Sequence, residues 1–220
     1  MKRIYLFFTL CLLTFSSFAG GNNMIGLTSK MGKDDGMISN GFYWNLGIGF
    51  PSYKITEFSG FDREKQGVQF TLEAGTQWMF VSSDRFGFGM NVSWITIGAS
   101  SYKIKDTDSK GFDVHLGLLR FGPMATVGLG DNAAVDVFFN LSPTVKYNLV
   151  TYANDNQSNN LIYWLAWTPG VKFRVKKFAV GVENSFGKMT FRNLDDNNSL
   201  VKDSYKVSYL NPRILLGMKF

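Results

Sequence analysis

The sequence predicts an all-β fold, an eight-stranded antiparallel up-and-down transmembrane β-barrel with long extracellular loops and short periplasmic turns. Three observations predict this fold. Apolar and polar residues alternate along eight segments, the connections between these segments alternate between long and short, and glycines occupy the polar phase. Beyond the first 19 residues, no apolar run approaches the length of a membrane-spanning helix, which is about 20 residues.

Residues 1–19 have the pattern of a secretory signal peptide. Lys2 and Arg3 form a positive start, and an almost unbroken apolar stretch of ten residues follows. Ser17 and Ala19 then place small residues at the −3 and −1 positions of a cleavage site after Ala19. The apolar stretch is too short for a membrane anchor, so we expect an exported, cleaved chain.

The domain boundaries follow from this cleavage. Residues 20–39, rich in Gly, Asn and Met, match no strand and are expected to form a periplasmic N-terminal leader, and 40–220 form the barrel. The single cysteine, Cys11, lies in the signal peptide. The mature chain is therefore expected to use neither disulfides nor thiolate chemistry.

The first three strands are expected at 41–50, 68–80 and 86–94, and the fourth begins at 112 and alternates clearly to 118. Their apolar residues recur at every second position, and most segments are near ten residues long, which suits a tilted strand crossing a bilayer. The residues expected to face lipid are Phe42, Trp44, Leu46, Ile48, Phe50, Val68, Phe70, Leu72, Ala74, Thr76, Trp78, Phe80, Phe86, Phe88, Met90, Val92, Trp94, Phe112, Val114, Leu116 and Leu118.

Alternation in the last four expected strands is clearest at 135–142, 163–173, 178–183 and 210–220. The same alternation holds, with Asp, Glu, Lys and Arg confined to the opposite phase. The residues expected to face lipid are Val135, Val137, Phe139, Leu141, Tyr163, Leu165, Trp167, Val171, Phe173, Phe178, Val180, Val182, Leu210, Ile214, Leu216, Met218 and Phe220.

The connections separate a membrane barrel from a soluble β-sandwich or lipocalin-like barrel, which would also alternate. Long connections at 51–66, 98–111, 149–160 and 187–204 alternate with short ones at 81–85, 128–132 and 176–177. This is the outer-membrane pattern of extracellular loops and periplasmic turns, with both termini periplasmic.

The inward phase also argues against a soluble fold, which would point large apolar residues inside. An eight-stranded barrel only just holds its own interior side chains, so small residues relieve crowding there. Aromatic residues gather at both ends of the outward phase, as in the girdles at membrane interfaces. The glycines on the inward phase are 47, 49, 75, 87, 89, 117, 170, 181 and 217.

The final strand carries the sharpest local pattern. Ile214, Leu216, Met218 and Phe220 alternate up to an aromatic C-terminal residue. With the topology of 41–220, this resembles the small eight-stranded outer-membrane barrels, such as the transmembrane domain of outer membrane protein A and its X- and W-type relatives. The resemblance implies that these four residues form the signal by which the barrel assembly machinery accepts the chain during insertion.

Four prolines do not fit the predicted regular strands. Pro143, Pro169 and Pro212 lie inside expected strands, and Pro123 interrupts the fourth. Proline cannot donate to a ladder, so we expect bulges or strand ends at these positions. The alternation also changes phase around 118–119, which is consistent with a bulge.

Charged residues on the inward phase form the main candidate site. Glu73, Asp136, Lys172, Glu183 and Arg213 fall at related depths in the predicted lumen. Either they form a closed network of paired charges, because a buried charge needs a partner, or Arg213 swaps between carboxylates and acts as a gate. The same phase also contains Lys146, Arg174 and Lys219.

Asp113 and His115 are expected at the lumen mouth. His115 is the only histidine, and some eight-stranded relatives are lipid A-modifying enzymes that use a histidine. No nucleophile motif accompanies it, and one histidine provides no metal site. We therefore expect no enzymatic activity, cofactor or metal, and a His115 that hydrogen-bonds to a lumen carboxylate.

The amino-acid composition limits the classes of molecule that the protein is expected to bind. Hydrophobic residues make up 45% and charged residues 18%, which excludes disorder, and the formal charge of +6 is scattered rather than clustered, which argues against nucleic acid. Outer-membrane lipid is expected on the wall. Lys103, Lys105 and Lys110 could contact lipopolysaccharide, and Tyr53, Phe58 and Phe61 could contact another envelope protein.

Three functions are compatible with the sequence. The first is a non-enzymatic structural, surface-recognition or complex-assembly protein with a closed lumen and partner-binding loops. The second is a narrow gated conduit, or a binding site for small or hydrophobic solutes. The third is a lipid A-modifying enzyme centred on His115.

Overall fold

The computed structural model describes residues 37–55, 64–65, 67–103, 109–152, 157–194 and 200–220. The expected signal peptide, most of the expected leader, and Phe58, Phe61 and Lys105 lie outside these residues. Within them, no helix is long and apolar enough to cross a membrane.

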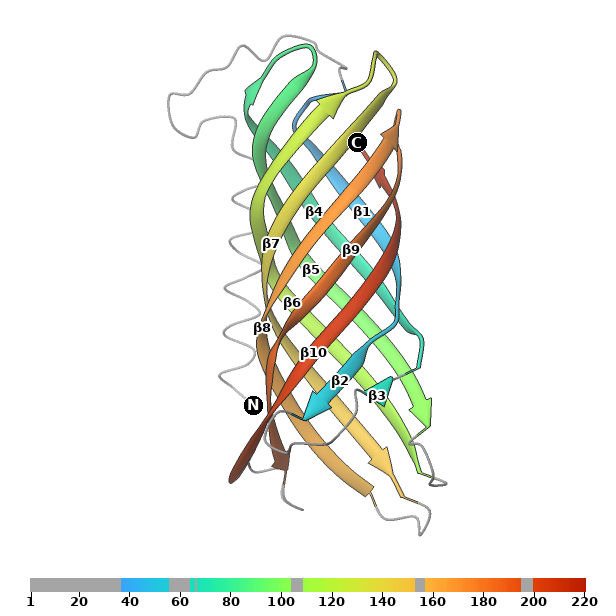
Figure 1. Cartoon of the computed structure of the whole chain (residues 1–220), viewed down its shortest axis with the longest axis vertical. Coiled ribbons are helices and arrows are strands. Elements are labelled where there is room, and N and C mark those ends of the chain that lie inside the picture. The colour runs from blue at the N-terminus through green and yellow to red at the C-terminus, as the bar shows by residue number, and fades with distance from the viewer. Residues whose placement is uncertain (1–36, 56–63, 66, 104–108, 153–156, 195–199) are drawn as a thin grey trace, which may run out of the picture. The chain divides into compact units, whose positions relative to one another are not determined.

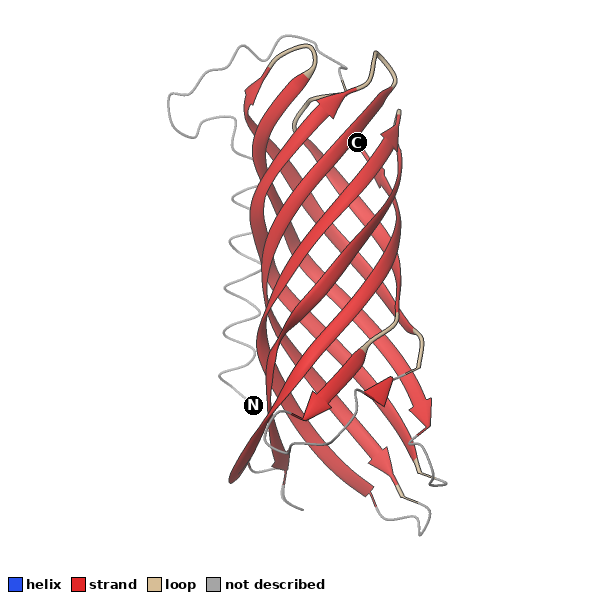
Figure 2. Cartoon of the chain, in the orientation of Figure 1, coloured by secondary structure: helices blue, strands red, loops and turns tan. Residues whose placement is uncertain are grey.

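Eight long strands close into a ring (Figures 1 and 2). Each is antiparallel to its neighbours, and the pairing of the first with the last closes the sheet, so the expected barrel is confirmed. The strands of the ring are β1 (Gly41–Gly49), β4 (Gln69–Ser82), β5 (Phe86–Lys103), β6 (Lys110–Gly128), β7 (Ala133–Thr151), β8 (Gln157–Val175), β9 (Phe178–Leu194) and β10 (Leu200–Lys219).

Two short strands were not expected. β2 (Ser52–Ile55) continues along β10 where β1 stops, and β3 (Glu64–Lys65) pairs with β2. Both belong to the connection between β1 and β4, so part of that predicted loop extends the sheet.

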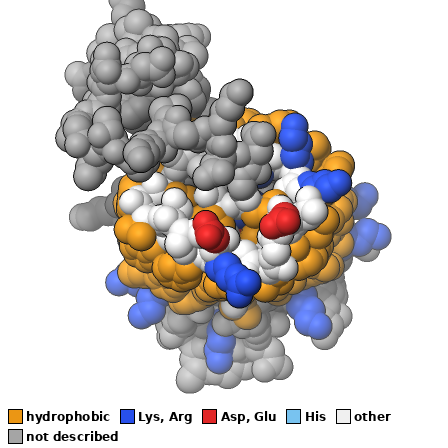
Figure 3. All heavy atoms as spheres, turned by 90° about the horizontal axis from the view of Figure 1, so that it is seen from above, with side chains coloured by type: hydrophobic (Ala, Val, Ile, Leu, Met, Phe, Trp, Pro, Cys, Tyr) orange, Lys and Arg blue, Asp and Glu red, His pale blue; other side chains and the backbone are white. Residues whose placement is uncertain are grey.

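The wall of the barrel is apolar outside and polar inside. Phe70 and Phe178 expose 62% and 67% of their surface, whereas Asp113 and Asp136 expose 0%. Seen along the barrel from the end with the short turns, hydrophobic side chains dominate the perimeter (Figure 3). A closed sheet with this polarity satisfies its backbone internally and presents hydrocarbon to its surroundings, which is the arrangement of a membrane β-barrel.

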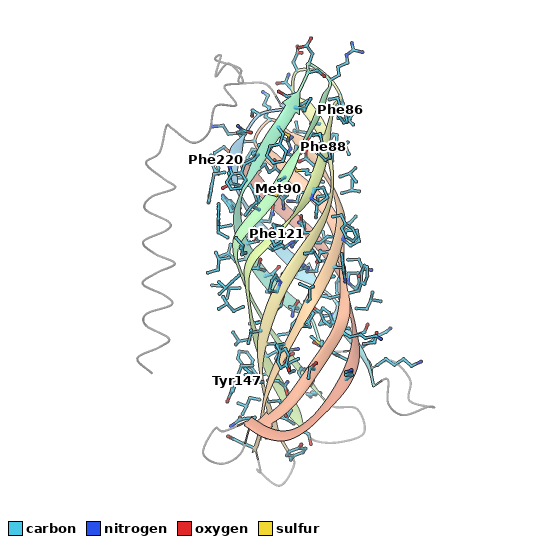
Figure 4. All side chains as sticks on the ribbon, turned by 90° about the vertical axis from the view of Figure 1, so that its left-hand side faces the viewer. Phe86, Phe88, Met90, Phe121, Tyr147 and Phe220 are labelled. Atoms are coloured by element: carbon cyan, nitrogen blue, oxygen red, sulfur yellow. The ribbon has the colours of Figure 1, made fainter. Side chains whose placement is uncertain are left out.

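Aromatic side chains stand near both ends of the wall. Phe86, Phe88 and Phe220 lie near one end and Tyr147 near the other (Figure 4). All four are exposed, between 41% and 56% of their surface. Aromatic rings favour the boundary between hydrocarbon and headgroups, so these positions match the expected girdles.

The two ends differ in their connections. The three predicted short turns are present between β4 and β5, β6 and β7, and β8 and β9; we call this side the turn end. At the opposite side, the loop end, β5 to β10 extend into the predicted long connections, leaving 104–109, 152–156 and 195–199 between strands. These three predicted connections therefore consist largely of strand, because backbone pairing continues into them. The sequence did not indicate this, because apolar and polar residues alternate less clearly there.

The four prolines that were expected to disturb strands all lie within strands, and each faces a gap in one ladder. Pro123, Pro143 and Pro169 pair on one side only, and Pro212 lies opposite the junction between β1 and β2. Only at Pro143 does the gap coincide with a bulge, so the expectation of bulges or strand ends is wrong for Pro123 and Pro169. A gap in one ladder is enough to accommodate a proline in a strand, because proline lacks only the backbone N–H that would donate to that side.

The predicted phase change in β6 is a bulge. The β6–β7 register shifts between Gly117 and Phe121, and Leu119 adopts a positive φ of 54°. Leu118 and Leu119 are consequently both exposed, at 38% and 51%, and Arg120 turns into the interior.

Candidate functional site: the charged interior

The barrel interior is filled with ionisable side chains. Among the described residues, six basic side chains and four carboxylates are buried there, together with His115. They form three groups along the barrel axis, which we call the turn-end group, the central cluster and the loop-end group. The buried charged residues are Glu73, Asp113, Arg120, Asp136, Lys146, Lys172, Arg174, Glu183, Arg213 and Lys219.

The central cluster is organised by Arg120. Its Nη1 lies 3.5 Å from Glu73 Oε2 and 3.3 Å from Glu183 Oε1, and its Nη2 forms a second, short ion pair with Glu183. Arg213 Nη2 reaches the same Glu183 Oε1 at 2.7 Å, and Tyr43 donates to Glu73 Oε1 at 2.9 Å. Charge-assisted, two-pronged arginine contacts of this kind are the strong ones inside a protein.

Sequence reasoning missed Arg120. It predicted Glu73, Glu183 and Arg213 in one network, and the structure places all three there. Arg120, which the alternation assigned to neither phase, joins Glu73 to Glu183. The sequence signal for Arg120 is the phase change at 118–119, which moves the residues that follow it to the opposite face. A one-residue slip moves every following side chain to the other face.

Lys172 lies beside the central cluster and contacts aromatic rings. Its Nζ lies 4.6 Å from the centre of the Tyr43 ring and 4.9 Å from that of Phe138. Cations over aromatic faces are attracted by the ring quadrupole, more so where water is excluded. Lys172 is therefore held by two rings beside the central cluster.

Asp136 belongs to the turn-end group. Arg174 contacts both of its carboxylate oxygens, with Nε at 2.6 Å and Nη2 at 2.9 Å, and Thr126 donates at 2.7 Å. Asp136 and Lys172 are cross-strand neighbours in β7 and β8, but the carboxylate turns toward Arg174. The five predicted network residues are thus all buried, but they are divided between two groups.

Cations at the turn end also hold the segment before β1. Arg174 Nη2 donates to the carbonyl of Met37 at 2.9 Å, and Lys219 Nζ donates to that of Ser39 at 2.6 Å. Asn40 accepts from the backbone of Met79 at 2.6 Å. The last residues of the expected leader are therefore tied to the turn end of the barrel.

The loop-end group contains Asp113, which forms a short ion pair with Lys146 and accepts from Ser100 at 3.1 Å. Lys146 also donates to the hydroxyl of Tyr53 at 2.5 Å. Tyr53, expected as a partner-binding loop residue, is instead only 8% exposed. It packs against Tyr209, with 5.4 Å between the ring centres, because β2 continues the alternation of β1 and directs Tyr53 inward.

His115, expected at the lumen mouth, is buried and exposes 5% of its surface. Its Nδ1 lies 3.3 Å from the amide nitrogen of Gln69 rather than against a carboxylate. The expectation of a lumen carboxylate partner is therefore wrong. The Asp113 carboxylate beside it is occupied by Lys146, Ser100 and the amide of Asn148.

The C-terminal residues of the expected assembly signal lie on the outer wall. Ile214, Leu216 and Phe220 expose 50%, 56% and 56% of their surface, and Met218 is half-buried. Among the described residues, no three His, Cys, Asp or Glu side chains are grouped so as to hold a metal ion.

Comparison with known proteins finds similarity of fold. No family model and no curated protein sequence matches this chain. The attachment invasion locus protein Ail of Yersinia pestis aligns with a TM-score of 0.49 at 12% identity, over 83% of this chain and 100% of Ail. Neisserial surface protein A aligns with a TM-score of 0.43 at 12% identity, over 81% and 97%.

An enzyme is also among the similar structures. The outer membrane protease OmpT of Escherichia coli aligns with a TM-score of 0.49 at 7% identity, over 85% of this chain and 99% of OmpT.

Proposed function

We propose that this chain is a non-enzymatic outer-membrane protein whose barrel is a rigid, closed anchor for surface recognition or the assembly of a complex. The observation that carries the proposal is the position of Arg120 between Glu73 and Glu183. These side chains meet from β4, β6 and β9, so their contacts tie three separate strands across the lumen.

Opening a path through the barrel would require breaking these contacts. Separating a buried ion pair leaves an uncompensated charge, which costs about 3–5 kcal/mol. Arg213 adds a second contact to Glu183, and the rings of Tyr43 and Phe138 fill space beside Lys172. A rigid wall with exposed connections is a suitable scaffold, because binding residues are commonly carried on loops that a rigid frame positions.

The proposed partners follow from the surface. The apolar wall contacts outer-membrane lipid, and the exposed Lys103 and Lys110 at the loop end are placed to contact phosphates of lipopolysaccharide. During insertion, the C-terminal residues of β10 would meet the barrel assembly machinery. Another envelope protein would bind through the loop end or the wall.

Single-channel recording in planar bilayers tests the closed lumen. The wild-type barrel is expected to be silent, and Arg120→Ala is expected to show discrete openings because its guanidinium crosses the lumen. Arg85→Ala, in the exposed turn between β4 and β5, is the matched control and should stay silent. Discrete openings in the wild type would contradict the proposal.

One observation favours the second candidate, a gated conduit. Arg120 and Arg213 share Glu183, so one arginine could hold this carboxylate while the other moves. Wild-type openings whose size or lifetime changes in Arg213→Ala would support a gate. A wild-type barrel that stays silent while Arg120→Ala conducts would support the anchor.

A further inference from the structure

A small cavity lies inside the barrel between the central cluster and the loop-end group. Its volume is about 20 Å³, enough for one water-sized particle. Every charged residue that lines it is basic. The cavity is lined by Arg120, Arg213, Trp164 and His115, together with the hydroxyl-bearing Ser142 and Thr144.

Two of the lining residues carry N–H groups that lack acceptors. Trp164 Nε1 and Arg213 Nε have no hydrogen-bond partner among the described residues. Both residues are more than nine-tenths buried, with 8% and 7% of their surface exposed. A buried donor without an acceptor is costly, so each of the two groups calls for an acceptor, and the cavity is a space that both residues line.

His115 contributes a third donor. Asn211 donates to Gln69 Oε1 at 2.7 Å, which leaves the Gln69 amide nitrogen to donate to His115 Nδ1. A neutral imidazole that accepts at Nδ1 carries its proton at Nε2. Three N–H donors therefore belong to residues around this cavity.

The surrounding charge is positive. Among the described residues, the buried lumen holds six basic side chains and only four carboxylates, and the two charged residues that line the cavity are Arg120 and Arg213. None of these four carboxylates lines the cavity. Since a buried excess charge requires a counter-charge, an acceptor that also carries a negative charge suits the cavity better than water does.

We propose that this cavity binds one small monovalent anion of the halide class, such as chloride, between Trp164 and Arg213. A space that accepts one water-sized particle suits a monatomic anion. The bound anion accepts from Trp164 Nε1 and Arg213 Nε, balances the central cluster and strengthens the closed state of the lumen.

Bromide scattering tests the site directly. The full-length protein, isolated folded from membranes, is crystallised in bromide salts, and data are collected at the bromine absorption edge. The expected result is an anomalous peak within hydrogen-bonding distance of Trp164 Nε1. Density without an anomalous signal at this position identifies water and overturns the proposal.

Unfolding equilibria provide a second, independent test. At constant ionic strength, chloride replaces gluconate stepwise. Above the dissociation constant, the unfolding equilibrium constant of the wild type should fall about tenfold for each tenfold rise in chloride, as expected for one site that exists only in the folded state.

Trp164→Phe keeps an aromatic ring and removes the N–H, so its unfolding should no longer depend on chloride. Trp167→Phe, on the outer wall of the same strand, is the matched control and should keep the wild-type dependence. The baseline stabilities of the variants do not affect this comparison. Equal stability of the wild type in chloride and gluconate would rule the site out.

Discussion

Arg120 and Glu183 face each other across the barrel interior, and the guanidinium of Arg120 donates to both carboxylate oxygens of Glu183. The two residues are 63 positions apart in the chain and come from β6 and β9, which are not neighbours in the sheet. Their contact is made possible by the bulge at Leu119, which turns Arg120 inward.

Replacing Arg120 with alanine should destabilise the barrel by about 3–5 kcal/mol, because Glu73 and Glu183 lose their shared partner while they stay buried. Urea unfolding in lipid bilayers, followed by tryptophan fluorescence, measures the change. Arg85→Ala, in an exposed turn, should change the free energy of unfolding by no more than about 0.5 kcal/mol. Equal effects of the two substitutions would contradict the role given to Arg120.

Lys176→Gly should stabilise the protein, by about 1 kcal/mol at most. Lys176 adopts a positive φ of 52° in the turn between β8 and β9, a conformation that costs an L-residue about 1–2 kcal/mol and glycine much less. Part of the gain is lost to the greater freedom of glycine in the unfolded chain. Lys177 has no positive φ. Lys177→Gly therefore increases the freedom of the unfolded chain without removing backbone strain, so it should be neutral or destabilising in the same unfolding assay.

Tyr53→Phe should weaken the loop-end group by about 1 kcal/mol, because the hydroxyl that accepts from Lys146 is removed while the ring is kept. Hydrogen exchange along β2 should become faster, since Tyr53 ties this short strand to the interior. Tyr152→Phe, at an exposed position, is the control. Unchanged exchange in Tyr53→Phe would show that β2 is held by its backbone pairing alone.

Gly98→Ala should destabilise the barrel by about 1–3 kcal/mol through overpacking. A Cβ at Gly98 would lie 2.0 Å from His115 Cε1, so the buried ring would have to move. Gly117→Ala is the matched control inside the same lumen, because its Cβ would approach other atoms no closer than 3.4 Å. Thermal unfolding of the two variants separates the effect of the clash from that of the substitution itself.

His115→Ala should leave the lipid A composition of cells that express the protein unchanged. His115 is buried and hydrogen-bonded to Gln69, and its neighbour Asp113 is engaged by Lys146. Mass spectrometry of extracted lipid A, compared between wild type and variant, gives the readout. A modified lipid A that depends on His115 would restore the enzymatic alternative.

Much of the fold could be predicted because alternation in a strand is local. The face on which a residue lies follows from its position in a period of two. Phe70 and Phe178 could therefore be assigned to the outer face, and Glu73 and Glu183 to the inner face, without knowing which residues lie beside them on adjacent strands. The short turns were equally accessible. The extended strands at the loop end were not, because polar residues continue to pair there without an apolar phase to mark them.

The sequence by itself determined the closed sheet, the apolar wall and the polarity of the lumen, since these follow from the order of residues along each strand. Only the tertiary structure decided which charges meet. The stagger between strands and the bulge at Leu119 bring Arg120 to Glu73 and Glu183, turn Asp136 toward Arg174 and leave His115 with Gln69. These partners come from distant strands, and their distances depend on register, which no local pattern records.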